Sequence, residues 1–204
     1  MDLITESLGI MMSGEQEIPD VPDGYEQLDY VVCPSSGQAG FEITGYTPIQ
    51  YDLHECKTSP YKIPTGSTSA QFAGTQDNYA DYYQVYYNIE SKITIYTKNS
   101  AASAKLPARD VVVNGTYISR FEINKTLTNN ARIGYRVLGN IYKFNGAIYY
   151  YKIWRLSNDS ENTLIYDFVP AKRVSDDKIG MYEKVNGVFY PSTTGTDFQA
   201  PTAE

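Results

Sequence analysis

Residues 181–190 read Met-Tyr-Glu-Lys-Val-Asn-Gly-Val-Phe-Tyr, with an Asn-Gly pair between two apolar segments. Asn-Gly is the strongest short-range signal for a β-hairpin, because a type I′ turn needs positive φ at both central residues. We therefore expect residues 181–185 to pair with residues 188–190. The same signal recurs along the chain and favours an all-β fold.

Two further Asn-Gly pairs, at positions 114–115 and 145–146, also lie between apolar residues. Each predicts a hairpin whose two strands flank the turn. The predicted pairs are residues 111–113 with 117–121 and residues 141–144 with 147–156.

Residues 82–97 show a period of two with one break, which is the pattern of half-buried strands. Other short strands are expected at residues 28–33, 41–46 and 69–73. We expect residues 47–66 and 100–108, which are rich in Pro, Ser and Ala, to form loops at the ends of the sheets. About ten to fourteen short strands without a helix predict a β-sandwich or barrel.

The N-terminal segment carries apolar side chains at helical spacing. These residues are Leu3, Ile4, Leu8, Met11 and Met12. So short a helix is unstable alone in water, so we interpret it as an attachment or oligomerisation peptide; the alternative is a helix packed on its own domain. Residues 13–24 are polar, acidic and contain two prolines, which predicts a semi-extended linker. We divide the chain into an anchor and linker (residues 1–20) and a β domain (residues 21–204).

Charge is distributed unevenly along the 204 residues, whose formal net charge is −7. Residues 1–56 hold eleven acids and no Lys or Arg, while residues 57–204 hold thirteen acids and seventeen bases. The acidic part suits a basic protein partner, or alternatively a solvated surface that aids solubility. Nucleic acid is disfavoured, because phosphate contacts need clustered Lys and Arg. No long apolar run is present, so we expect no membrane insertion.

Cys33 and Cys56 form no CxxC or zinc pattern. We expect two buried, reduced thiols, and a disulfide between them remains the alternative.

The N-terminus has no basic region before an apolar stretch, so no secretory signal is expected and assembly in a cytoplasm is inferred.

Catalysis has little support in the sequence. His54 is the single histidine, and it is expected to be structural or exposed rather than part of a triad. Glu42, Glu90 and Glu122 each stand alone on a predicted strand, without the second carboxylate that glycoside hydrolysis needs. We therefore expect no enzyme activity, no catalytic residues and no cofactor; a calcium site remains open, although no EF-hand-like loop is present.

Twenty tyrosines are the most unusual feature of the composition. One group crowds a single predicted strand and its approach: Tyr79, Tyr82, Tyr83, Tyr86 and Tyr87. A second group consists of residues 149–151 and Trp154. Aromatic faces stack on sugars, so a glycan is a possible ligand, but alternation along a strand turns only half of each group outward. Packing in the core or in a subunit interface is the favoured alternative.

Several short motifs occur in order between residues 21 and 198. They are residues 21–30 (Val-Pro-Asp-Gly-Tyr-Glu-Gln-Leu-Asp-Tyr), 41–48 (Phe-Glu-Ile-Thr-Gly-Tyr-Thr-Pro), 72–74, 148–153, 164–171 (Leu-Ile-Tyr-Asp-Phe-Val-Pro-Ala), 179–183, 185–190 and 195–198. This series resembles the laminin-G-like, concanavalin-A-like jelly-roll domains of virion proteins from phages of gut bacteria. The resemblance implies a jelly-roll β-sandwich behind the N-terminal anchor. We expect the strand that holds Asp167 to end at Pro170, since proline cannot continue a central ladder.

By the same resemblance, the chain is expected to be a virion structural protein, a head fibre or capsid decoration, assembled in the host cytoplasm. Its N-terminal segment would bind a capsid or other virion protein, and the chain would form a symmetric homo-oligomer, a dimer or trimer. The alternatives are a carbohydrate-binding adhesin or receptor-binding tail protein and, less favoured, a glycoside hydrolase.

Overall fold

The computed structural model describes residues 20–60, 69–76, 82–88, 92–99, 102–105, 111–113, 116–123, 126–134, 144–156 and 162–201. The predicted anchor residues Leu3, Ile4, Leu8, Met11 and Met12 lie outside these ranges, as does Tyr79. All regular structure within the described ranges is β-strand, which confirms the all-β prediction. Among the described residues, no helix is long and apolar enough to cross a bilayer.

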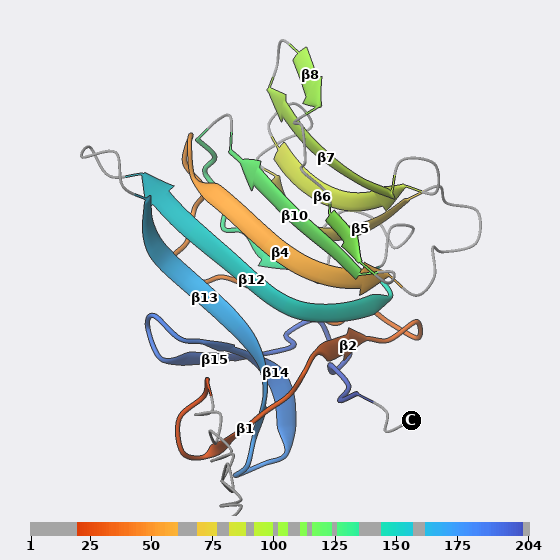
Figure 1. The fold of residues 1–204 in the computed structure, drawn as a ribbon, viewed down its shortest axis with the longest axis vertical. Coiled ribbons are helices and arrows are strands. Elements are labelled where there is room, and N and C mark those ends of the chain that lie inside the picture. Colours follow the sequence, from red (N-terminus) through yellow and green to blue (C-terminus); the bar gives the residue numbers. More distant parts are fainter. Residues whose placement is uncertain are drawn as a thin grey trace, which may run out of the picture.

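Nine strands form the larger, antiparallel sheet (Figure 1). Its main path runs β15 (Val188–Pro191), β14 (Lys178–Glu183), β13 (Asn162–Arg173), β12 (Gly146–Leu156), β4 (Leu53–Pro60), β10 (Thr116–Glu122) and β9 (Val111–Val113). Two short strands lie off this path: β1 (Tyr25–Gln27) pairs with β13, and β2 (Val31–Cys33) pairs with β12.

Six strands form the second antiparallel sheet. Its order is β3 (Phe41–Glu42), β11 (Arg132–Ile133), β5 (Ser69–Gln76), β6 (Tyr82–Asn88), β7 (Lys92–Asn99) and β8 (Ala102–Lys105). In Figure 1, β6, β7 and β8 lie at the upper end of the molecule, and β1 lies at the opposite end.

One hydrophobic core joins the two sheets. Ala73 of β5, Phe41 of β3 and Ile133 of β11 belong to the same buried cluster as Tyr151 of β12 and Phe168 of β13. Full burial of such side chains contributes about 1.5–3 kcal/mol each, so this shared core is the main link between the sheets. The arrangement is consistent with a β-sandwich.

A smaller apolar cluster covers the other face of the larger sheet. Val21 and Tyr25 pack with Val169, Tyr182 and Phe189, while the neighbouring Phe168 and Met181 belong to the main core. Tyr25 contacts the Tyr182 ring at a centroid distance of 4.8 Å and the Phe189 ring at 5.4 Å. Residues 20–27 therefore fasten the start of the described chain onto β13, β14 and β15.

The register confirms two of the predicted hairpins. Val113 pairs with Thr116, which leaves the two-residue loop expected at Asn114-Gly115. Strands β14 and β15 also pair as expected, with Met181 opposite Tyr190. The third prediction is wrong at its turn. Residues 141–143 lie outside the described residues, but Ala147 pairs with Val32 of β2 on one side and with Ser59 of β4 on the other, which leaves no free edge for a hairpin partner.

The turn between β14 and β15 differs from the prediction. Its last pair is Glu183 with Val188, so the loop has four residues, and of the Asn-Gly pair only Gly187 has positive φ (70°). The cause is the buried Glu183 carboxylate, which accepts hydrogen bonds from the backbone N–H groups of Val185 (2.8 Å) and Asn186 (2.7 Å). These bonds hold residues 184–187 in a wider turn than type I′.

Two predicted loops contain strands. Strand β4 occupies residues 53–60 and lies between β12 and β10, and β8 occupies residues 102–105. The strand period is hidden in β4 because its buried positions are His54, Cys56 and Thr58 rather than large apolar residues. Sequence patterns find strands by their apolar face, which β4 lacks.

Three strand boundaries also differ from expectation. The segment 28–33 is strand only at β2, and the segment 41–46 is strand only at β3, followed by a turn at Gly45 with φ of 81°. Strand β13 continues three residues past Pro170. Pro170 is tolerated because pairing with β12 ends at Phe168 and pairing with β1 begins at Ala171, so its missing N–H falls between two partners.

Candidate functional site

The predicted tyrosine group falls on strand β6, which lies between β5 and β7. The register places Val85 opposite Ala73, whose side chain is fully buried in the core. Because successive strand residues belong to opposite faces, Tyr83 and Tyr87 share the face of Ala73, and Tyr82 and Tyr86 belong to the other face. The group is therefore split between two faces of the sheet.

The second aromatic group lies on β12, and its partly exposed rings contact charged residues of the same sheet. The Lys57 Nζ atom lies 4.8 Å from the Tyr149 ring centroid, and the Arg120 guanidinium lies 5.7 Å from that of Trp154. The Tyr150 hydroxyl donates to Glu55 Oε1 (3.1 Å). Burial, assisted by Glu55, raises the pKa of Tyr150 above its usual value.

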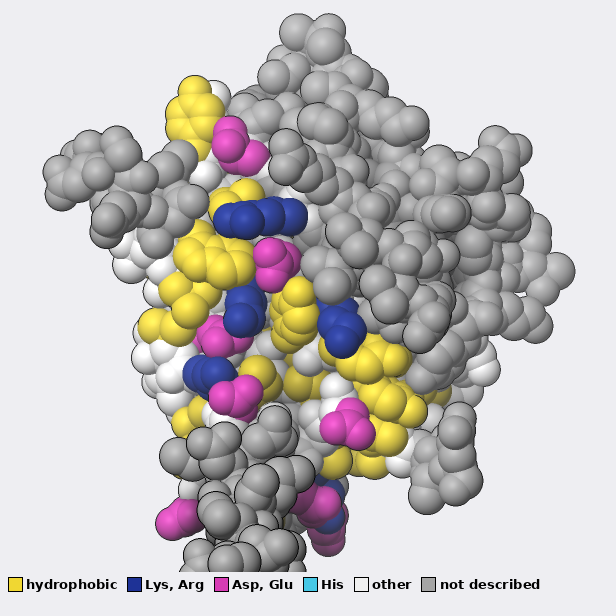
Figure 2. Space-filling view, in the orientation of Figure 1, with side chains coloured by type: hydrophobic (Ala, Val, Ile, Leu, Met, Phe, Trp, Pro, Cys, Tyr) yellow, Lys and Arg dark blue, Asp and Glu magenta, His cyan; other side chains and the backbone are white. Residues whose placement is uncertain are grey.

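Ion pairs extend across the same face of the larger sheet. Lys184 Nζ lies 3.3 Å from Asp167 Oδ2 and 3.1 Å from Asp20 Oδ1, and Lys152 Nζ lies 3.9 Å from Asp167 Oδ1. Figure 2 shows Lys and Arg side chains alternating with Asp and Glu side chains over this face. The pair with Asp20 is exposed and is worth about 0–1 kcal/mol, whereas Asp167 is buried and is covered by its two partly exposed lysines.

A buried polar network lies at one end of the core, around the single histidine. The Tyr46 hydroxyl lies 2.9 Å from Asp52 Oδ2 and 2.8 Å from His54 Nε2, and the Tyr151 hydroxyl lies 2.8 Å from His54 Nδ1. Arg155 reaches the network from the surface and binds Asp52 through Nε and Nη2, each at 3.0 Å. Asp52 and His54 are fully buried.

Hydrogen-bond directions in this network assign the histidine tautomer. Asp52 is ion-paired with Arg155, so it acts as an acceptor, and the Tyr46 hydroxyl donates to it. The Tyr46 oxygen then accepts from His54 Nε2–H, and His54 Nδ1 accepts from the Tyr151 hydroxyl. Burial lowers the pKa of His54 to about 3, with Asp52 opposing the shift and Arg155 adding to it.

The geometry gives His54 a structural role. The sequence left open whether His54 is structural or exposed, and it is fully buried with both ring nitrogens hydrogen-bonded to tyrosines. A general base must reach a substrate proton, and this enclosed ring does not. The network instead ties the loop at Tyr46 to β4 and β12.

The structure describes two of the three strand carboxylates that the sequence analysis weighed against glycoside hydrolysis. Glu42 pairs with Arg132 (3.1 Å) and accepts from Asn130 (2.9 Å), Glu122 is exposed, and Glu90 lies outside the described residues. Among the residues that the structure describes, no cluster of three or more His, Cys, Asp or Glu could hold a metal ion. For the calcium site left open by the sequence, the described residues thus supply no carboxylate cluster of this size.

Both cysteines are free and buried, as predicted. The Cys33 thiol lies 3.6 Å from the Ala39 carbonyl oxygen, and burial raises its pKa well above the usual range. A thiol in this state is a poor nucleophile, because the thiolate is the reactive form. The cysteines act as small core side chains.

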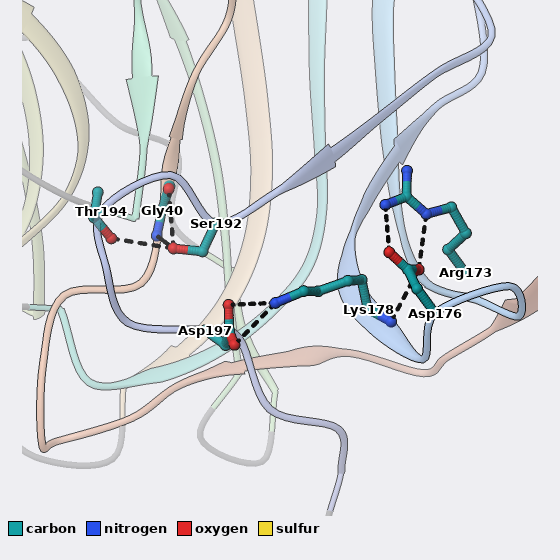
Figure 3. A network of polar contacts seen from close by, with 7 residues as sticks. All are labelled: Gly40, Arg173, Asp176, Lys178, Ser192, Thr194 and Asp197. Atoms are coloured by element: carbon teal, nitrogen blue, oxygen red, sulfur yellow. Dashed lines mark hydrogen bonds and ion pairs between the residues drawn. The ribbon is translucent and has the colours of Figure 1, made fainter.

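Polar contacts near the C-terminus tie residues 192–199 back onto residues 32–40 (Figure 3). The Gly40 N–H donates to Ser192 Oγ (3.0 Å), and the Gly40 carbonyl accepts from the Thr193 N–H (2.8 Å). Nearby, Arg173 makes a two-pronged ion pair with Asp176 (2.9 and 2.7 Å). The first two contacts hold the segment after β15 against Gly40, and the ion pair stabilises the turn between β13 and β14.

Sequence reasoning missed the face that Tyr82 and Tyr86 share. Tyr96 of β7 lies opposite Gln84 of β6, so it belongs to that same face. The signal was present, because Tyr96 alternates with Ile93, Ile95 and Thr97 in the strand pattern of residues 92–98.

Comparison with known proteins found no matching family model, no similar curated protein and no similar solved structure.

Proposed function

We propose that this chain is a structural protein of a phage particle, a head fibre or capsid decoration, which displays its β domain and attaches through its N-terminal segment. The observation that carries the proposal is the spatial grouping of the motifs behind the resemblance. Strand β1, from the motif at residues 21–30, pairs with β13, from the motif at residues 164–171. Strand β13 pairs with β14, and β14 with β15, which hold the later motifs.

A jelly-roll topology is the finer part of this proposal. Two antiparallel sheets that share one core are its basic requirement. Such a topology also needs neighbouring strands that are joined by long connections. The pairs β12 with β4 and β1 with β13 are of this kind, since their strands lie far apart in the sequence.

Attachment through the N-terminus would determine which end of the domain faces the particle and which end faces outward. Asp20 is ion-paired with Lys184, and Val21 is buried against the larger sheet, so the chain enters the domain at a fixed point. Strand β1, which follows that point directly in the chain, lies toward one end of the long axis in Figure 1, and β8 lies at the other. Residues 1–19 would bind a capsid or other virion protein, within a dimer or trimer, and β6 to β8 would lie far from the particle surface.

Incorporation into particles tests the proposal. Particles made with a chain that lacks residues 1–20 should carry none of it. A sharper pair of variants keeps the segment: Leu3→Asp with Leu8→Asp charges the apolar stripe, whereas Thr5→Asp with Ser7→Asp adds the same charge beside it. We expect only the first pair to lose the chain from purified particles; full occupancy without residues 1–20 refutes the attachment.

A carbohydrate-binding adhesin, including a receptor-binding tail protein, is the second candidate. It is favoured by the placement of Tyr82 and Tyr86 on the sheet face opposite Ala73. A polysaccharide array probed with the full chain separates the candidates, because a purely structural protein should bind no glycan. Glycoside hydrolysis is not proposed, since the buried Asp52 and Glu183 carboxylates are engaged by Arg155 and by backbone N–H groups.

A further inference from the structure

The turn between β14 and β15 contains an Asn-Gly pair whose side-chain amide is bound to a buried carboxylate. Asn186 donates to Glu183 Oε2 twice, from its backbone N–H (2.7 Å) and from Nδ2 (2.8 Å). Asn186 Nδ2 also lies 3.4 Å from the Ile165 carbonyl oxygen. Both neighbours of this amide are acceptors, so its nitrogen, and not its oxygen, faces Glu183.

An Asn-Gly pair is chemically labile, because glycine has no side chain to hinder attack by its own nitrogen. The Gly187 nitrogen attacks Asn186 Cγ, so that a C–N bond closes a five-membered succinimide ring. The Cγ–Nδ2 bond breaks, and Nδ2 leaves as ammonia with the proton from the Gly187 nitrogen. Water then opens the ring at one of its two carbonyls, which leaves aspartate or isoaspartate at position 186.

Two features of this turn oppose the attack. The amide is folded back toward the Asn186 N–H, since both donate to one oxygen, whereas the attacking Gly187 nitrogen lies on the other side of the Asn186 Cα. Negative charge also develops on the amide oxygen during attack, and the fully buried Glu183 carboxylate beside it repels that charge. The N–H groups of Asp167 (2.9 Å) and Val185 (2.8 Å) hold this carboxylate in place.

We propose that Asn186 is a modification site that the fold keeps blocked: Glu183 holds its amide against deamidation, and loss of this contact allows conversion to aspartate or isoaspartate. The product does not fit the turn. A carboxylate in place of the amide turns the 2.8 Å hydrogen bond to Glu183 into a contact between like charges. Lys184 of the same turn binds Asp20 (3.1 Å), so the reaction would alter the point where the N-terminal segment enters the domain.

The rate of deamidation at Asn186 in the full chain tests the proposal. The native chain and the chain in concentrated urea are incubated at the same mildly alkaline pH, and mass spectrometry of the digested chain scores the replacement of NH by O at position 186. One hydrogen bond to a charged group that must break before the attack corresponds to about a tenfold slowing. We therefore expect the native rate to lie about tenfold or more below the rate in urea.

Variants separate the contact with Glu183 from folding in general. Glu183→Gln keeps the size of the side chain and removes its charge, so it should lose the protection at temperatures where thermal melting shows it to be folded. Glu26→Gln is the matched control, because Glu26 is an exposed carboxylate of the same sheet, paired with Lys172 (2.7 Å). Its protection should equal that of the native chain.

Two substitutions of Asn186 itself test the fate of the product. Asn186→Asp reproduces the aspartate product, and Asn186→Ala loses the same hydrogen bond without adding a charge. The urea midpoint of Asn186→Asp should lie below that of Asn186→Ala.

Protection that is lost in Glu183→Gln and kept in Glu26→Gln supports the proposal. A native chain that deamidates at Asn186 as fast as the chain in urea overturns it, and so does a folded Glu183→Gln variant with full protection. Where Glu183→Gln does not fold, the two substitutions of Asn186 decide: a lower midpoint for Asn186→Asp supports the contact, and an equal or higher one overturns it.

Discussion

Acid should destabilise this protein in a pH range where carboxylates scarcely titrate, and His54 should be the cause. Its pKa is about 3 in the folded chain, against 6.5 for an ordinary histidine. The unfolded chain therefore takes up a proton first as the pH falls. Stability from the neutral ring is complete above pH 6.5 and is lost progressively as the pH falls toward 3.

The magnitude follows from the difference in proton uptake. Each pH unit between the two pKa values costs about 1.36 kcal/mol, so moving from pH 7.5 to pH 5 should lower the free energy of unfolding by about 2 kcal/mol. Urea unfolding of the full chain, followed by fluorescence at both pH values, measures this directly. No other histidine contributes, because His54 is the single one in the chain.

The variant His54→Gln supplies the control. It loses the bonds to Tyr46 and Tyr151 and should be less stable at pH 7.5 by about 1–3 kcal/mol, but it has no ring to protonate. Its stability should therefore change by less than about 0.5 kcal/mol between the two pH values. A wild-type chain that is equally stable at pH 7.5 and 5, or a variant that keeps the full pH dependence, refutes the assignment of a neutral, enclosed histidine.

Three further predictions concern the fold. Glu183→Ala should lower the free energy of unfolding by about 2–4 kcal/mol in urea titrations, because the buried N–H groups of Asp167 and its neighbours in the turn lose their acceptor; an unchanged midpoint contradicts this. Arg155→Ala should lower the free energy of unfolding by about 2–3 kcal/mol in the same titrations, since it leaves Asp52 buried without its cation. Arg155→Lys keeps the charge and should lower it by less, so equal losses in the two variants contradict this. Cys33 and Cys56 should both resist a thiol reagent in the native chain and both react in concentrated guanidinium, and rapid native labelling would contradict their burial.

Hairpins were the most predictable part of the fold, because their signal is local. The Asn114-Gly115 pair gave the register of β9 and β10 correctly, with Val113 opposite Thr116. The same dipeptide at Asn186-Gly187 gave the correct strands and the wrong turn, since the Glu183 carboxylate competes for the turn's N–H groups. Such a side-chain cap depends on burial of Glu183, which adjacent sequence does not reveal.

The centre of the larger sheet was the least predictable part. Strand β4 buries His54, Cys56 and Thr58, and each needs a partner that lies far along the chain, as Tyr151 does for His54. Local patterns favour a loop at such residues because their polarity, taken alone, indicates exposure. Only the tertiary pairing with β12 and β10 makes the strand stable.

On the outer face of the larger sheet, the charged and aromatic side chains already contact one another. On the larger sheet, Trp154 is covered by Arg120, Tyr149 contacts Lys57, and Asp167 holds two lysines, so binding there must first break contacts within the protein. By this reasoning Trp154, the single tryptophan of the chain, stabilises its own sheet.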